Sequence, residues 1–273
     1  MRMKPADIVK PVVLGAAAVL MIFPIYWMIT GSFKPNLSLW ATPPEWVPHR
    51  VTMQHFTELF DKKPTLRWLF NSVYAAGVSV LFIVLFCAMA GYAYAKKTFP
   101  GHHVLFFFII ATMMMPRQVT LIPLYRLVSD WGLLDSYTGL ILPGLAYPFG
   151  VFLIRQFVRY IPDELLQAAS IDGAGELRIF FRIVVPLIAP ALGALAIFAF
   201  MAEWNDYIWQ LIVLQKDTMK TLPLGVSGLI RQDLSINYGL AMAGGTVASV
   251  PLIAFFLTFQ KSFIRGVALG SEK

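Results

Sequence analysis

The residues whose types and spacing could do chemistry are few, and the densest group of them is acidic. Four of the 15 Asp and Glu residues lie between Asp163 and Glu176. Pro162 suits the first turn of a helix, where its missing N–H needs no partner, and Gly173 suits the position just after a helix end. The spacing predicts a helix over residues 162–173, about 11 residues and roughly 16 Å long. Such a helix is too short to cross a bilayer.

One face of this short helix is predicted to be a docking surface for another protein. Leu165, Ala168, Ala169 and Asp172 recur at helical spacing and share that face, and the small residues at its centre allow a close approach. An interfacial helix that lies on lipid is the alternative. Anionic lipid would repel the exposed acidic residues, so docking is the favoured interpretation.

A second group of residues could line or gate a solute pathway. Its members are Arg117, which follows Pro116, and the segment Glu203, Trp204, Asn205 and Asp206. The ordinary alternatives are a snorkelling arginine and an interfacial aromatic residue between solvated acids. For Arg117 the two interpretations stay equally open.

The sequence lacks the motifs that would make this chain an enzyme or give it a metal or cofactor site. It contains no G-x-x-x-x-G-K-[ST] phosphate loop, no serine in a nucleophile motif and no mid-membrane proton relay. His102 and His103 are adjacent, so they cannot face one metal ion from a helix. A chain of this kind that moved a solute would therefore take its energy from a partner, or it would be an ATP-independent channel or secondary carrier.

The composition places these groups in a membrane protein. The 273 residues are 58% hydrophobic and 14% charged, with a mean hydropathy of +0.68, whereas soluble chains carry roughly 25% charged residues. A helix needs about 20 apolar residues to cross a bilayer. Such runs predict an all-α polytopic protein with a single transmembrane domain, residues 1–273, and six spans over residues 11–30, 68–95, 104–125, 137–154, 183–202 and 238–260. Prolines inside the fourth, fifth and sixth spans predict kinks, which could be hinges or static bends. These prolines are Pro143, Pro148, Pro186, Pro190 and Pro251.

The distribution of basic residues predicts the orientation. The short connection that contains Lys96 and Lys97 is the clearest positive segment, and the positive-inside rule places it in the cytoplasm. Both termini and the acidic helix are then cytoplasmic as well. The net charge of +7 would mostly face anionic lipid at this inner side. No basic patch is interleaved with stacking aromatic residues, so nucleic acid is not expected as a partner.

The segment from Glu164 to Ala174, with Phe180, Phe181 and Pro186 after it, resembles the "EAA" signature of permease subunits of bacterial ATP-binding-cassette (ABC) importers. Residues 122–125, 139–143, 204–207 and 221–225 resemble the sugar-permease branch that contains the inner subunit of the maltose transporter. The resemblance covers the chain from end to end. It implies a type I ABC-importer permease that moves a sugar or sugar-like solute by alternating access across a bacterial or archaeal cytoplasmic membrane.

The resemblance also implies partners. The complex would contain a second permease, with a heterodimer favoured, two ATPase subunits that hold ATP and Mg, and an extracytoplasmic solute-binding protein. In the family the EAA helix docks on the ATPase subunit. The matching residues here are Glu164, Leu165, Gln167, Ala168, Ala169, Ile171, Asp172, Gly173 and Ala174.

Three further positions follow from the same resemblance. Gln167 replaces the family's glutamate, so it keeps a hydrogen-bonding head but loses the charge. The loop between the last two spans would contact the binding protein, with Leu229, Ile230, Arg231 and Gln232 as candidates. The C-terminal residues 266–273 would reach the ATPase pair.

Overall fold

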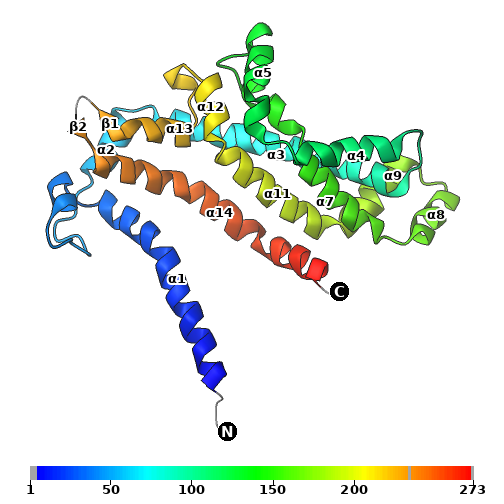
Figure 1. The fold of residues 1–273 in the computed structure, drawn as a ribbon, viewed down its shortest axis with the longest axis horizontal. Coiled ribbons are helices and arrows are strands. Elements are labelled where there is room, and N and C mark those ends of the chain that lie inside the picture. Colours follow the sequence, from blue (N-terminus) through cyan, green and yellow to red (C-terminus); the bar gives the residue numbers. More distant parts are fainter. Residues whose placement is uncertain (1–4, 233–234, 272–273) are drawn as a thin grey trace. The chain divides into compact units, whose positions relative to one another are not determined.

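The computed structural model describes residues 5–232 and 235–271 and shows a chain built almost entirely of helices (Figure 1). The all-α fold class is therefore confirmed. The chain divides into two compact units. Unit 1 comprises residues 1–67 and 222–250, and unit 2 comprises residues 68–221 and 251–273. Two of the three boundaries fall within long helices, α3 (Thr65–Lys96) and α14 (Tyr238–Ser271), and the third lies just before Leu222.

Unit 1 consists of short elements around long helices. Its elements are α1 (Pro5–Ser32), η1 (Asn36–Trp40), α2 (Gln54–Asp61), α13 (Leu222–Ser227), η5 (Gly228–Ile230), the strands β1 (Arg231–Gln232) and β2 (Ser235–Ile236), and the first part of α14. The two strands form one antiparallel pair. A Cβ atom on Gly245 of α14 would lie 2.8 Å from the sulfur of Met28 in α1. Glycine thus permits the close helix approach that is typical of membrane helices.

A buried lysine fixes the segment that follows α1. Lys34 is 1% exposed, its ammonium group donates to the carbonyl of Glu45, and its Nζ lies 4.3 Å from the centroid of the Trp27 ring. Burial lowers the pKa of Lys34, and the charge of Glu45 opposes this shift. The carbonyl and the aromatic ring compensate for part of the hydration that the ammonium group has lost.

Unit 2 contains the main apolar core. Its elements are most of α3, α4 (His102–Met113), α5 (Arg117–Asp130), α6 (Tyr137–Ile141), η2 (Leu142–Leu145), α7 (Pro148–Arg159), α8 (Asp163–Ile171), α9 (Glu176–Ile179), the π turn η3 (Phe180–Val184), α10 (Val185–Leu187), α11 (Ala189–Trp204), α12 (Tyr207–Val213), η4 (Asp217–Met219) and the end of α14. Buried residues of α3, α7, η3 and α11, such as Ile83, Ile154, Val184 and Leu195, form one cluster. The single cysteine, Cys87, belongs to this cluster and is 1% exposed.

Three unbroken helices are long and apolar enough to cross a membrane. They are residues 10–32 of α1, the whole of α3, and residues 238–260 of α14. Three more candidates are bent pairs: α4 with α5 (102°), α6–η2 with α7 (44°), and α9–η3–α10 with α11 (79°). The described residues thus offer three spans, or up to six if each bent pair is one span. The predicted count of six stays a prediction.

Prolines stand where the second helix of each bent pair begins. Pro116 is the N-cap residue of α5, Pro148 is the first residue of α7, and Pro190 lies in the first turn of α11. Proline is tolerated at a helix start because the N–H that it lacks would have no partner there. At Pro148 and Pro190 the structure therefore differs from the predicted kinks within continuous helices, because one helix ends there and another begins in a new direction. Pro251 lies inside the continuous helix α14.

Candidate functional site

The predicted acidic surface helix is present as α8. It spans Asp163–Ile171, with Pro162 as the N-cap residue and Asp163 and Glu164 in the first turn, so it begins one residue later and ends two residues earlier than the predicted range. Gly173 has a φ of +80°. Its N–H donates to the carbonyl of Ser170 (3.1 Å), and the N–H of Ala174 donates to that of Ala169 (3.0 Å). This pair of bonds is the Schellman motif that ends helices.

The two sides of α8 have different roles. Leu166, Ala169 and Ala174 are partly buried and pack against the core cluster of unit 2. The outer side leaves Leu165 43% exposed and Ile171 86% exposed. The predicted docking residues that also lie exposed are Glu164, Gln167, Ala168, Asp172 and Gly173. The predicted common face is thus corrected at Ala169, which points toward the core because it lies one turn from Leu166.

Two consecutive lysines at the end of α3 hold the first residue of α8 and the segments before and after this helix. Lys96 Nζ lies 2.7 Å from Asp163 Oδ1 and donates to the carbonyl of Ile161 (2.5 Å). Lys97 Nζ lies 2.6 Å from Glu176 Oε1. The pKa of Lys97 is raised: burial lowers it, but the hydrogen bond to Glu176 and the neighbouring Tyr92 raise it by more. The ammonium group of Lys97 is therefore charged at neutral pH and favours the ion pair.

A cavity of about 640 Å³ gathers most of the second predicted group. The predicted residues that line it are Arg117, Glu203 and Asp206. Arg117 Nη2 lies 2.8 Å from Asp206 Oδ2 and so joins the start of α5 to the start of α12. The carboxylate of Glu203 lies against Gly144, where a Cβ atom would approach Glu203 Oε1 to 2.6 Å. The cavity thus carries two carboxylates and one guanidinium group, which is already paired.

The remaining members of this group lie outside that cavity. Trp204 is 3% exposed and, with Asp206, lines a smaller cavity of about 10 Å³, a volume that admits about one water molecule. Asn205 is exposed, and its Nδ2 donates to the carbonyl of Met201 (2.8 Å) at the end of α11. Asp206 also caps α12, because its Oδ1 accepts from the N–H of Trp209 (3.4 Å).

Several cavity residues were not predicted from the sequence. Gln118, Thr120, Tyr147 and Trp209 add polar and aromatic groups to the wall. Part of this wall could have been predicted from the sequence. Arg117, Thr120, Leu121 and Leu124 recur at i, i+3, i+4 and i+7 of α5, and all four line the cavity. Tyr147 is the N-cap residue of α7 and Trp209 lies in α12, and only the packing of unit 2 brings them there.

The loop that was predicted to contact a binding protein is described in part. Leu229 is 2% exposed, and its Cδ1 lies 3.3 Å from where Gly244 would carry a Cβ atom. Leu229 therefore packs on α14 within unit 1, and its assignment as a contact residue stays a prediction. Ile230 ends η5, and Arg231 and Gln232 form β1. The side chains of these three residues lie outside the described part of the chain.

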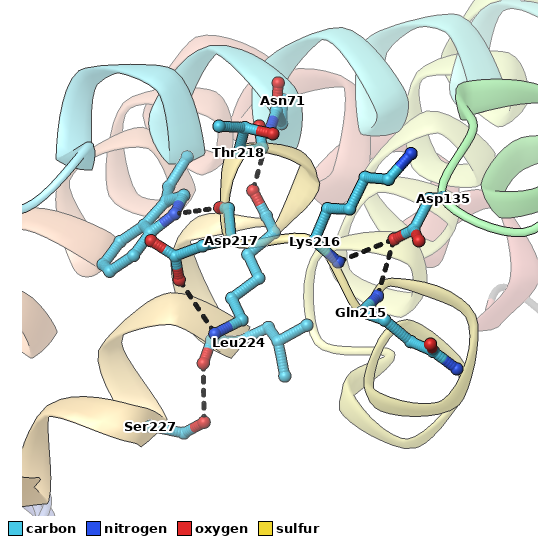
Figure 2. A network of polar contacts seen from close by, with 10 residues as sticks. Asn71, Asp135, Gln215, Lys216, Asp217, Thr218, Leu224 and Ser227 are labelled. Atoms are coloured by element: carbon cyan, nitrogen blue, oxygen red, sulfur yellow. Dashed lines mark hydrogen bonds and ion pairs between the residues drawn. The ribbon is translucent and has the colours of Figure 1, made fainter.

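The 214–221 loop, which follows α12, is tied down at two places. At the first, Asp135 Oδ1 accepts from the backbone N–H groups of Gln215 (2.6 Å) and Lys216 (2.8 Å), as Figure 2 shows. Asp135 has a φ of +54°, a left-handed conformation that aspartate tolerates better than most residues. Its own N–H donates to the carbonyl of Val213 (3.0 Å), so Asp135 holds the backbone at residues 213, 215 and 216.

At the second place, the start of α3 holds the same loop. Asn71 Nδ2 donates to the carbonyls of Thr218 (2.9 Å) and Lys220 (2.8 Å), and Figure 2 shows Asn71 next to Thr218. Asn71 Oδ1 accepts from the hydroxyl of Tyr137 (2.6 Å), and Trp68 Nε1 donates to the carbonyl of Asp217 (2.8 Å). A buried amide with all these partners fixes the loop in one conformation.

The described residues, 5–232 and 235–271, contain no group of three His, Cys, Asp or Glu side chains that could hold a metal ion. The arrangement instead offers a surface helix, a polar cavity and a fixed loop, whose chemistry is hydrogen bonding and ion pairing.

Two proteins that this chain resembles are permease proteins of saccharide transport systems. The arabinooligosaccharides transport system permease protein AraQ of Bacillus subtilis (strain 168) is 37% identical over 259 residues, which is 94% of this chain and 92% of that protein. The lactose transport system permease protein LacG of Rhizobium radiobacter is 35% identical over 282 residues, covering 100% of this chain and 98% of that protein. The resemblance that the sequence indicated is thereby confirmed.

A solved structure shows the same fold. It is a bacterial ABC transporter involved in the import of the acidic polysaccharide alginate, and it matches with a TM-score of 0.85 at 23% identity over 96% of this chain and 99% of that chain. The family model for the inner membrane component of binding-protein-dependent transport systems matches residues 83–269, a range that holds α8 and the cavity. The chain belongs to this family of binding-protein-dependent inner membrane transport components.

Proposed function

We propose that this chain is the permease subunit of an ATP-driven ABC importer for a sugar or sugar-like solute. The observation that carries the proposal is α8, a stiff nine-residue helix with an exposed outer side. The names of the relatives, permeases for arabinooligosaccharides and lactose, support the solute class. As a permease component the chain is not an enzyme, and ATP hydrolysis belongs to a separate subunit.

The partners follow from this role. We propose a second permease, two ATPase subunits that hold ATP and Mg, and an extracytoplasmic binding protein, in a bacterial or archaeal cytoplasmic membrane. A second matched structure is an alginate ABC transporter in complex with a periplasmic protein that carries an alginate pentasaccharide. A single transmembrane domain over residues 1–273 with six spans would place α8 on the ATPase side.

The outer side of α8 supports docking on the ATPase. Ile171 is 86% exposed and Leu165 is 43% exposed on a helix that is otherwise polar outside. Large exposed apolar side chains on a polar surface are typical of interaction sites. Gln167 lies between them and supplies a neutral hydrogen-bonding group. Closure of the ATPase pair would then push α8 as a rigid body.

The cavity near Arg117, Glu203 and Asp206 supports a solute pathway. Its volume of about 640 Å³ falls within the range of roughly 300–1,000 Å³ that is usual for small-molecule sites. Its wall combines carboxylates with Tyr147, Phe149 and Trp209. Hydroxyl-rich solutes suit such a wall, because carboxylates accept hydrogen bonds and aromatic rings cover apolar sugar faces.

The test is an Ala168→Arg substitution in the assembled complex. Ala168 is exposed at the centre of the outer side of α8, so an arginine there would introduce an unpaired charge into a docked surface. We expect association with the ATPase subunit to weaken on the order of tenfold or more, measured by co-purification and by solute-stimulated ATP hydrolysis. Gln54→Arg, on the exposed side of α2, is the matched control and should change neither.

Two results would contradict the proposal. One is full co-purification of the ATPase with the Ala168→Arg variant. The other is solute uptake by the purified wild-type chain alone in lipid vesicles without ATP, which would identify an ATP-independent channel or carrier.

A further inference from the structure

We propose that Lys96 and Lys97 are positioning residues that transmit the movement of α8 to the helices of unit 2. The inference rests on the proposed function, since it presumes that an ATPase moves α8. The two lysines are consecutive at the end of α3, and they reach opposite ends of α8. Lys96 contacts Asp163, the first residue of α8, and Ile161 before it, whereas Lys97 contacts Glu176 after it.

The contact before α8 involves charge and backbone together. Lys96 Nζ contacts both Asp163 Oδ1 (2.7 Å) and the carbonyl of Ile161 (2.5 Å). The side chain of Lys96 is 8% exposed, whereas that of Asp163 is 68% exposed. A nearly buried ammonium group has few other partners available, and charge-assisted bonds are short and strong. Lys96 therefore fixes the start of α8 to the end of α3.

The contact after α8 involves three side chains. Glu176 pairs with Lys97 through Oε1 (2.6 Å) and accepts from the Tyr92 hydroxyl through Oε2 (3.2 Å). Lys97 Nζ lies 5.4 Å from the centroid of the Tyr92 ring, and that ring packs against Phe180 of the π turn. Tyr92 and Lys97, at the end of α3, thus hold Glu176, the first residue of α9, in the segment that leads from α8 to η3.

The end of α3 is itself rigidly joined to α7. A Cβ atom on Gly91 would lie 2.7 Å from Ile154 Cγ2 and 2.9 Å from the backbone nitrogen of Arg155. Arg155 Nε donates to the carbonyl of Tyr94 (3.0 Å). A displacement of α8 that pulls on the two lysines would therefore move α3 and α7 together. The helix α7 begins directly after Tyr147, a residue that lines the cavity, at the bend that separates α7 from α6–η2.

This role predicts a loss of coupling without a loss of assembly. The Lys97 and Glu176 side chains are 41% and 64% exposed, and exposed ion pairs add little to stability, so the fold should survive the loss of this pair. The Lys96 side chain is 8% exposed, but its partner Asp163 is 68% exposed and stays hydrated without it, and an apolar methionine suits the buried position. The variant is Lys96→Met with Lys97→Met, which keeps side-chain length and removes charge. Lys62→Met with Lys63→Met, two consecutive lysines just before α3 begins, is the matched control.

The experiment uses the complete complex with its binding protein in proteoliposomes. The measured quantity is ATP hydrolysed per solute imported, together with co-purification of the ATPase. We expect the Lys96/Lys97 variant to assemble normally and to use about fivefold or more ATP per solute, the lower end of typical coupling between sites. Lys97→Glu should show a similar defect, and adding Glu176→Lys should restore most of the wild-type ratio.

Three results would overturn the inference: an unchanged ratio in the Lys96/Lys97 variant, an equal change in the Lys62/Lys63 control, or loss of ATPase co-purification, which would mean a docking role. Absence of rescue in the Lys97→Glu, Glu176→Lys double variant would also count against it. Failure of the proposed function would look different, because the wild-type complex itself would then show no ATP-dependent uptake.

Discussion

At the scale of single residues, the end of α8 depends on Gly173. Its φ of +80° is the left-handed conformation that costs other residues about 1–2 kcal/mol. No atom lies within 4 Å of where its Cβ would be, so any effect of a substitution there comes from the backbone and not from a clash.

Gly173→Ala should therefore loosen α8 by about 1–2 kcal/mol, because the two bonds that end the helix require the left-handed turn. Hydrogen exchange of the α8 amides would rise by roughly tenfold per 1.4 kcal/mol. Gly175→Ala is the control: Gly175 has an ordinary φ of −69° and equally open surroundings. Equal exchange rates in both variants would show that the turn does not limit α8.

At the scale of elements, the packing of α3 on α7 depends on a glycine that has no room for a side chain. A Cβ on Gly91 would press on the backbone nitrogen of Arg155 at 2.9 Å. A backbone atom cannot rotate away as the end of a side chain can. The two helices would have to separate to admit even a methyl group.

Gly91→Ala should therefore destabilise unit 2 by about 1–3 kcal/mol, the usual cost of overpacking, and lower the melting temperature of the purified complex by a few degrees. Gly77 lies in the same helix with nothing within 4 Å of its Cβ position. Gly77→Ala should leave the melting temperature unchanged or raise it, since alanine favours helix by up to about 1 kcal/mol. A melting temperature of the Gly91→Ala variant at or above the wild-type value would show that α3 and α7 are not in tight contact.

Elements whose ends are set by neighbouring residues could be predicted from the sequence, whereas features set by packing could not. The limits of α8 follow from local chemistry at Pro162 and Gly173, and the sequence therefore predicted them to within two residues. The 102° turn between α4 and α5 does not follow from hydropathy, because a broken and a straight apolar helix have the same composition. The partly buried position of Ala169 was not predicted. Its spacing from Leu165 places it on the same face as Leu165, Ala168 and Asp172, but Ala169 also lies one turn from Leu166, and both of these residues pack against the core.

At the scale of the whole molecule, transport should depend on the ion pair that joins α5 to α12 beside the cavity. Arg117 is 68% exposed and Asp206 19% exposed in their side chains, so the pair contributes at most about 1 kcal/mol to stability. Its position beside the cavity wall gives it more influence on passage than on folding. The cavity itself was foreseen only at Arg117, Glu203 and Asp206, since its other walls come from residues distant in sequence.

Arg117→Gln and Asp206→Asn should each slow solute import in proteoliposomes by up to about fivefold, the equivalent of ~1 kcal/mol. Asparagine keeps the capping oxygen for α12, so Asp206→Asn removes mainly the charge. Because both variants remove the same pair, the double variant should be no slower than either single one. Arg126→Gln, at an exposed position of the same helix α5, should import at the wild-type rate; additive effects of the two single changes would contradict a shared role.

The buried position of Cys87 has a practical consequence for spectroscopy. It is the only cysteine in the sequence, and it lies 1% exposed among the apolar residues of unit 2, where a maleimide or spin label cannot reach the thiol without opening the core. The native chain therefore needs no cysteine removal before labelling. A cysteine introduced at an exposed position of α8, such as Ala168, would carry the whole signal, and the distance between that label and one on the ATPase could follow each catalytic cycle.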